Sequence, residues 1–156
     1  MRLREEIKQK QPFRSLEEEV ALNLLRTANA LAQGFAPPLR ETDLTGTQYN
    51  VLRILRGAGK DGLPCGEIAA RMITKDPDIT RLLDRLQRRG LVARERDSAD
   101  RRVVVTRIAT EGLALLAELD EPVMETHARL LGHLGPRKLR QLATLLEEAR
   151  AKVPTD

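Results

Sequence analysis

Residues 74–108 read TKDPDITRLLDRLQRRGLVARERDSADRRVVVTRI, and the first half of this stretch has the pattern of a helix. Its apolar residues recur at alternating spacings of three and four, which places them on one helical face: Ile79, Leu82, Leu83 and Leu86. Asp76 and Pro77 predict the helix start, because an Asp side chain accepts first-turn N–H groups and proline has no N–H to lose. Gly90 predicts its end. We therefore expect a helix over residues 76–89.

The second half of the stretch has the pattern of a β-hairpin. Residues 91–93 and 103–105 are short runs enriched in valine, as strands are. Residues 94–102 between them are too polar to be buried. A helix with a charged outer face followed by a hairpin with a basic tip outlines a winged helix, with its wing at residues 94–105.

Positive charge is concentrated in the same part of the chain. Residues 71–107 contain eleven basic and six acidic side chains, whereas the whole chain has 27 basic and 23 acidic, so the remainder has 16 and 17. Such a concentration fits a surface that binds phosphate. Charge alone would equally fit a solvated helix face and an exposed loop. The order of helix, glycine and hairpin favours a nucleic-acid partner.

The composition favours packed helices. Aromatic residues are 2% of the chain and hydrophobic residues 41%, so the core must be aliphatic. The fold class we expect is mainly α with a small β-hairpin wing. A single cysteine, Cys65, excludes an internal disulfide, and no apolar run approaches the roughly 20 residues of a membrane span. We expect a cytoplasmic protein with no membrane partner.

Helices are also predicted on either side of the stretch. Ser15 and Glu18 match a capping box for a helix that we expect to end near Phe35, because Gly34 and the prolines at 37–38 follow. The remaining predicted helices cover residues 48–56, 66–72, 110–134 and 137–153. In the last of them, leucines, an alanine and a valine form a seam with spacings of three and four. The helix at 66–72 and the turn at Thr74-Lys75 make residues 66–89 a helix-turn-helix.

This order of motifs resembles the MarR family of bacterial winged-helix regulators over residues 15–153. The segments that carry the resemblance are Glu67-Ile68-Ala69, residues 79–86, residues 89–94, and the wing residues 96–102 followed by Gly112. The resemblance implies a symmetric homodimer whose first and last helices form the interface. It also implies a recognition helix in each major groove and a small aromatic or phenolic effector, or oxidation, as the signal.

Two departures from the family pattern concern helix starts. Residues 63–65, Leu-Pro-Cys, replace the usual Ser or Thr cap of the first helix of the helix-turn-helix. Ile108-Ala109 replaces the usual Leu-Thr, so we expect Thr110 to cap the helix after the wing. Neither departure affects the residues that are expected to face DNA.

The residues that we assign to DNA binding lie on the recognition helix, before it and on the wing: Lys75, Asp78, Thr80, Arg81, Arg85, Arg88, Arg101 and Arg102. Thr80 and Arg81 lie near the helix start, where side chains reach base edges. Arg85 and Arg88 suit phosphate contacts or plain surface charge.

Two acidic residues in this region are assigned structural roles. Asp84 would repel phosphate, so we expect it to pair with Arg81 or Arg88 one turn away. By resemblance, Asp100 pairs with Arg102 and orders the wing, while Arg101 or Arg102, with a preference for Arg102, enters the minor groove.

The sequence thus predicts a homodimeric transcriptional regulator, a ligand-responsive repressor that binds a pseudo-palindromic operator in double-stranded DNA. Residues 1–156 form a single chain, with dimerisation helices at 15–36 and 113–153 and a DNA-binding region at 45–110. The alternative is a winged-helix module that binds proteins without specific DNA. The sequence contains no catalytic constellation, metal-ligand cluster or cofactor motif, and Cys65 is better explained as a small buried residue than as a redox switch.

Overall fold

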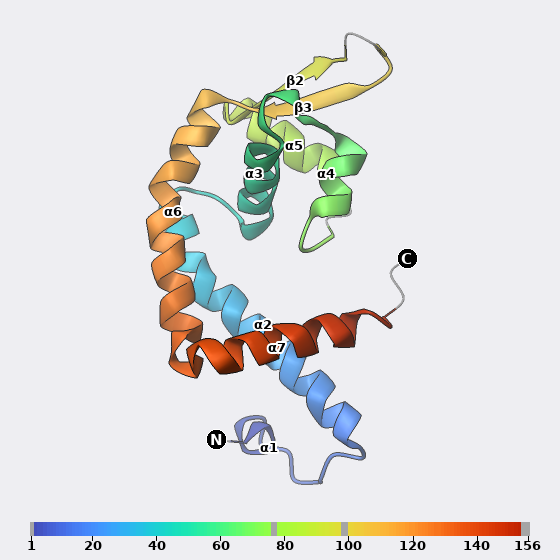
Figure 1. Ribbon diagram of the computed structural model, residues 1–156, viewed down its shortest axis with the longest axis vertical. Coiled ribbons are helices and arrows are strands. Elements are labelled where there is room, and N and C mark those ends of the chain that lie inside the picture. Colours follow the sequence, from blue (N-terminus) through green and yellow to red (C-terminus); the bar gives the residue numbers. More distant parts are fainter. Residues whose placement is uncertain (1, 76–77, 98–99, 154–156) are drawn as a thin grey trace.

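The computed structural model describes residues 2–75, 78–97 and 100–153 and is divided into a compact lobe and a frame of long helices (Figure 1). The lobe contains α3 (Gly46–Ala58), α4 (Cys65–Arg71), α5 (Ile79–Arg88) and a small sheet. The frame contains α2 (Leu16–Glu41), α6 (Thr110–Leu131) and α7 (Gly135–Arg150), with the short α1 (Leu3–Glu6) beside the start of α2. Short 3-10 turns η1 (Gly59–Asp61) and η2 (Gly132–Leu134) precede β1 and α7. The mainly helical class with a β wing is confirmed.

The wing is a three-stranded antiparallel sheet in the order β1-β3-β2. β2 (Val92–Arg96) pairs with β3 (Val104–Ile108), so the strands continue past the segments that were predicted. The wing is exposed on one face, which lets polar side chains such as Arg94 occupy a strand while the backbone groups pair. β1 (Leu63–Pro64) was not predicted, because two residues are too few to show a pattern.

The core of the lobe is aliphatic, as the composition requires. The predicted stripe of α5 is buried, with Leu82 3%, Leu83 0% and Leu86 0% exposed. It packs with Leu52 and Leu55 of α3 in one continuous cluster. This burial fixes which face of α5 remains available to solvent.

The first long helix does not end where it was predicted to. α2 continues through Pro37 and Pro38 to Glu41. Prolines in a helix remove N–H donors, but Leu39 and Leu44 are buried at this end of the helix (7% and 5% exposed). The N–H of Leu44 also donates to the Leu39 carbonyl over 2.9 Å. Tertiary packing therefore holds the last turn in place of the missing hydrogen bonds.

The predicted end of α5 is confirmed, and its start is shifted. Gly90 has φ +70°, and its N–H donates to the Gln87 carbonyl over 2.9 Å. The helix begins at Ile79, capped by Asp78, whose side chain accepts the Arg81 N–H at 3.3 Å. The predicted start at Asp76 and Pro77 lies outside the described residues.

After the wing, α6 begins at residue 110 as predicted but without the predicted cap, and the start of α7 differs from prediction. α6 begins at Thr110, and Ala109 occupies its cap position without a side-chain hydrogen bond, so Thr110 is not the cap. α7 begins at Gly135 instead of residue 137, because Gly135 takes the left-handed φ of +72° and Pro136 fits the first turn. Within α6, a Cβ on Gly112 would lie 2.3 Å from the Leu91 carbonyl oxygen, so the helix can approach the sheet this closely only with glycine there.

Thr106 provides a test of how the lobe is stabilised. It is 1% exposed in the middle of the sheet, and its hydroxyl has no hydrogen-bond partner among the described residues. Because burying an unpaired hydroxyl is unfavourable, Thr106→Val should raise the free energy of unfolding by about 1 kcal/mol. Urea unfolding followed by circular dichroism measures it, with the exposed Thr144→Val on α7 as control. A Thr106→Val variant that unfolds at lower urea would contradict this assignment.

Candidate nucleic-acid interface

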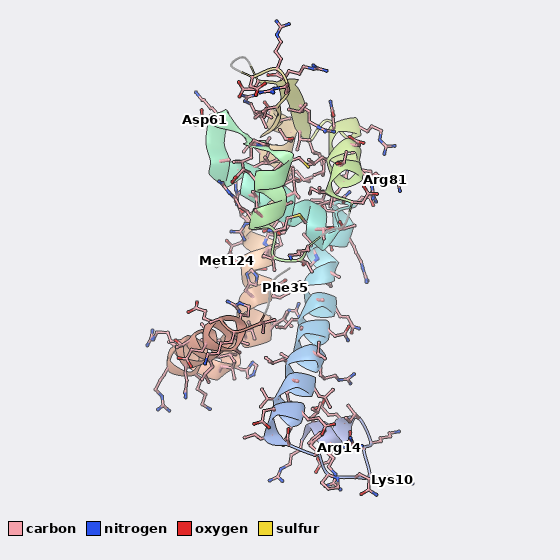
Figure 2. All side chains as sticks on the ribbon, turned by 90° about the vertical axis from the view of Figure 1, so that its right-hand side faces the viewer. Lys10, Arg14, Phe35, Asp61, Arg81 and Met124 are labelled. Carbon is pink, nitrogen blue, oxygen red and sulfur yellow. The ribbon has the colours of Figure 1, made fainter. Side chains whose placement is uncertain are left out.

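The outer face of α5 presents polar side chains to solvent. Thr80, Arg81, Arg85 and Arg88 are all exposed, as is Lys75 before the helix. Figure 2 shows Arg81 projecting from the outer side of the lobe. The geometry follows directly from the apolar stripe, because burying one face of an α-helix turns the opposite face outward.

Asp78 stabilises the start of this helix. Besides capping α5, its carboxylate lies 3.1 Å from Nε of Arg81. The carboxylate therefore restrains the arginine that was predicted to read bases. Both residues are within one turn of the helix N-terminus, the part of a recognition helix that meets base edges.

The predicted partner of Asp84 is wrong. Its carboxylate pairs with the guanidinium of Arg94 on β2, and not with Arg81 or Arg88 one turn away on its own helix. The Arg94 side chain is only 20% exposed, because the sheet packs beside α5 and brings it there. Arg88 instead donates Nε to the Asp84 backbone carbonyl over 3.4 Å. The Asp84–Arg94 pair links α5 to the wing.

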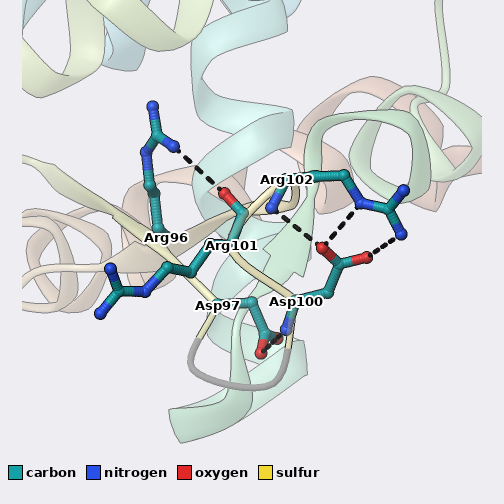
Figure 3. A network of polar contacts seen from close by, with 5 residues as sticks. All are labelled: Arg96, Asp97, Asp100, Arg101 and Arg102. Carbon is teal, nitrogen blue, oxygen red and sulfur yellow. Dashed lines mark hydrogen bonds and ion pairs between the residues drawn. The ribbon is translucent and has the colours of Figure 1, made fainter.

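The tip of the wing is held by the predicted pair of Asp100 and Arg102 (Figure 3). Nε of Arg102 lies 3.1 Å from Oδ1, Nη2 lies 3.0 Å from Oδ2, and the Arg102 backbone N–H donates to Oδ1 over 3.0 Å. The Arg102 side chain, followed by its backbone N–H, lowers the pKa of Asp100, and Asp100 in turn raises the pKa of Arg102. The pair is therefore fully charged near neutral pH.

Backbone hydrogen bonds close the turn below this pair. Asp97 donates its N–H to the Val103 carbonyl over 2.9 Å, and the Val103 N–H donates to the Asp100 carbonyl over 2.9 Å. Arg96 donates to the Arg101 carbonyl over 3.4 Å. The Arg101 guanidinium points away from Asp100 in Figure 3, and no residue in the described part of the chain pairs with it.

Neither a metal centre nor a membrane span is found in the described part of the chain. No three His, Cys, Asp or Glu residues there are grouped as metal ligands would be. His127 instead makes an edge-on ring contact with Phe35, with centroids 4.7 Å apart. None of the described helices combines the length and apolar character that crossing a bilayer needs.

Comparison with known proteins identifies the family. The MarR family model matches residues 42–103. The transcriptional regulator FarR of Neisseria gonorrhoeae is 31% identical over 137 residues, which cover 88% of this chain and 92% of FarR. The chain belongs to the MarR family. This membership confirms the expected class of function, a DNA-binding transcriptional regulator.

Solved structures of family members agree with the fold. The MarR transcription factor of Planctomyces limnophilus is 42% identical, with a TM-score of 0.67, and the match covers 87% of this chain and 98% of that one. NadR, solved in complex with 4-hydroxyphenylacetate, is 30% identical with a TM-score of 0.72, over 92% of this chain and all of NadR. The similarity therefore extends beyond the winged helix to the frame helices.

In this MarR-family chain, two arginines make contacts between the lobe and the frame that were not predicted. Arg56 of α3 makes two hydrogen bonds of 2.8 and 2.9 Å to the Asp120 carboxylate of α6, which lowers the pKa of Asp120. Arg89, just after α5, donates to the backbone carbonyls of Asp43 and Thr42 at the end of α2, over 2.5 and 3.0 Å. Their partners lie 46 to 64 positions away, a separation at which no sequence pattern signals a contact. Both contacts connect the DNA-binding lobe to the frame.

Proposed function

We propose that this MarR-family chain is a homodimeric, sequence-specific repressor whose α5 enters the major groove and whose wing reaches the adjacent minor groove. One observation carries the proposal: the helix that exposes Thr80 and Arg81 is joined through Asp84 and Arg94 to a hairpin with an ordered arginine tip. Major-groove reading and minor-groove insertion then come from one connected unit.

The residues proposed to face DNA are those assigned from sequence, with distinct roles. Thr80 and Arg81 face base edges, with Asp78 restraining Arg81. Lys75, Arg85 and Arg88 face phosphates. Arg101 and Arg102 form the wing tip, where the Asp100–Arg102 pair keeps the turn ordered and leaves the Arg101 guanidinium unpaired among the described residues.

The dimer is proposed from the faces that the single chain leaves uncovered. α2 exposes Leu16 (71%), Val20 (48%) and Leu24 (38%), and α7 exposes Leu142 (38%) and Leu145 (53%). Apolar side chains gathered on two helices suit an interface between copies. The dimerisation regions are then residues 15–36, continued by α2 to Glu41, and 113–153, with the DNA-binding region at 45–110.

The proposal also includes an effector and a cellular location. A small aromatic or phenolic carboxylate is the effector class, supported by NadR, a relative solved with 4-hydroxyphenylacetate. The protein acts in the cytoplasm, has no catalytic activity and needs no cofactor. Melting curves with and without 4-hydroxyphenylacetate test the effector class, and an unchanged midpoint at millimolar ligand would count against it.

Selection of bound fragments from a genomic library, followed by footprinting, tests the function itself. We expect a pseudo-palindrome with half-site centres about 10 bp apart, or slightly more, because a two-fold dimer presents its helices to successive major grooves. Affinity should fall steeply with salt, since arginine contacts release counterions from phosphate. Protection of a single asymmetric half-site, or an affinity that is flat between low and physiological salt, would contradict the scheme. Failure to retain any fragment would favour a protein-interaction module.

A further inference from the structure

An open basin lies beside the recognition helix, on the side that faces the frame. It has a volume of about 430 Å³ and is formed where the end of α2, the start of α3 and the second half of α5 meet. We call it the basic basin, because its charged lining residues are Arg40, Arg85, Arg88, Arg89 and Asp43. Four arginines and one aspartate thus line the basin.

The positive charge of the arginines in the basic basin is not neutralised by ion pairs within the described part of the chain. In the described part of the chain no carboxylate pairs with any of the four. Among the described residues, Arg85 and Arg88 each donate only Nε, to carbonyls one turn back over 3.4 Å, which holds the side chains along α5 and leaves their terminal nitrogens without a partner there. Arg89 donates to the carbonyls at the end of α2, and Arg40 pairs with no residue in the described part of the chain.

The charge of the lining favours an anionic ligand, because four arginines and one aspartate are among its residues. Among the described residues that line the basic basin, Leu44 is the only aliphatic one and is 5% exposed, so the lining consists mainly of polar groups and the carbon stems of the arginines. Guanidinium groups with free terminal nitrogens bind phosphate-type oxygens through paired hydrogen bonds. The N-terminus of the 13-residue α3 adds partial positive charge at the same place.

We propose that the basic basin binds a phosphate-type oxyanion and thereby connects the dimerisation helix α2 to the recognition helix α5. The oxyanion is either a phosphate of the operator DNA backbone, bound on the side of α5 nearer to α2, or a free ion in solution. The DNA source rests on the proposed function, whereas the free-ion source does not.

Arg40→Gln tests the proposal, because Arg40 lies on α2 and is the basin arginine that has no other assigned role. The matched control is Arg14→Gln, which makes the same charge change beyond the opposite end of α2 (Figure 2). Arg40→Lys keeps the charge but loses the paired hydrogen bonds, so it should retain the salt slope of the wild type with a weaker affinity. Circular dichroism and sedimentation confirm that each full-length variant is folded and dimeric.

The first measurement is affinity for the selected operator as a function of salt. Each phosphate contact contributes about 0.9 to the slope of log K against log salt, so losing one on each subunit should make the slope shallower by roughly 2. The second measurement is the melting midpoint in inorganic phosphate against chloride at constant ionic strength. A shallower slope for Arg40→Gln alone supports the DNA source. An unchanged slope with a phosphate-dependent rise in Tm that only Arg40→Gln loses supports the free ion.

If Arg40→Gln matches Arg14→Gln in both measurements, the basic basin binds no oxyanion and the proposal is overturned, while operator binding by the wild type leaves the proposed function standing. If the wild type retains no DNA, the proposed function fails instead. The phosphate measurement then decides the proposal alone, and a Tm that phosphate does not raise overturns it.

Discussion

Deleting residues 137–156 is expected to convert the protein into a monomer and to abolish operator binding. The deletion removes all but the first two residues of α7, a helix with no buried residue in the single chain. Figure 1 shows α7 crossing the frame at the end far from the lobe, so its loss leaves the winged helix intact. What is lost is one of the two helices whose exposed apolar side chains are proposed to meet a second copy.

The expected loss of affinity follows from the linkage of two half-sites. A dimer binds its second half-site as an intramolecular event, which raises overall affinity by roughly 100- to 10,000-fold over one lobe alone. A monomer with a folded lobe should retain only weak, salt-sensitive binding. Sedimentation velocity gives the oligomeric state, and fluorescence anisotropy gives the affinity for the operator.

A double substitution distinguishes the effect of losing the interface from the effect of losing the whole C-terminal segment. Leu142→Glu combined with Leu145→Glu places charge on the exposed apolar side of α7 and should also dissociate the dimer, because burying an unpaired carboxylate is costly. Glu147→Gln together with Glu148→Gln is the control for altered charge on the same helix. A truncated protein that still sediments as a dimer would refute the assignment of α7 to the interface.

Periodicity accounts for what the sequence revealed about the fold. The stripe of Leu82, Leu83 and Leu86 predicted which face of α5 is buried, and Gly90 predicted where the helix stops, because both signals are local. The boundary near Pro37 was wrong for the opposite reason. Burial of Leu39 is a tertiary effect, and it overrides the local signal of two prolines.

In the candidate site too, local contacts were predicted and tertiary contacts were not. The Asp100–Arg102 pair spans two positions, and the family resemblance pointed to it in advance. The partner of Asp84 was predicted one helical turn away, whereas the fold offers Arg94 on a neighbouring strand. No sequence pattern assigned Arg40 to a site, because it joins Arg85 in one basin only where three helices meet.

Asp100→Ala is expected to weaken operator binding although it removes a negative charge from a DNA-binding surface. Asp100 fixes Arg102 through three hydrogen bonds, so the wing tip has less conformational entropy to lose on binding. Releasing it should reduce the binding free energy by about 0.5–1.5 kcal/mol. Arg102→Ala removes the paired cation as well and should reduce it by about 1–3 kcal/mol.

The effect should not depend on pH near neutrality. The pKa of Asp100 lies below its usual value of 3.8, so the pair is complete above that pH and is lost only as pH falls through the depressed pKa. The difference between wild type and Asp100→Ala should therefore be constant from about pH 6 to 8. A difference that changes across this range would indicate that another group orders the tip.

Glu95→Ala is the matched control, because it removes the same charge from the wing. The Glu95 side chain is 71% exposed, and its one ion pair within the described residues is a 3.4 Å contact with Arg107. If simple repulsion governs, both variants should bind the operator more tightly than wild type. If Asp100 orders the wing, Glu95→Ala should bind as tightly or more so, while Asp100→Ala binds less tightly and remains a folded dimer. Anisotropy at one salt concentration distinguishes the two cases, and an Asp100→Ala protein that binds more tightly than wild type would eliminate the ordering role.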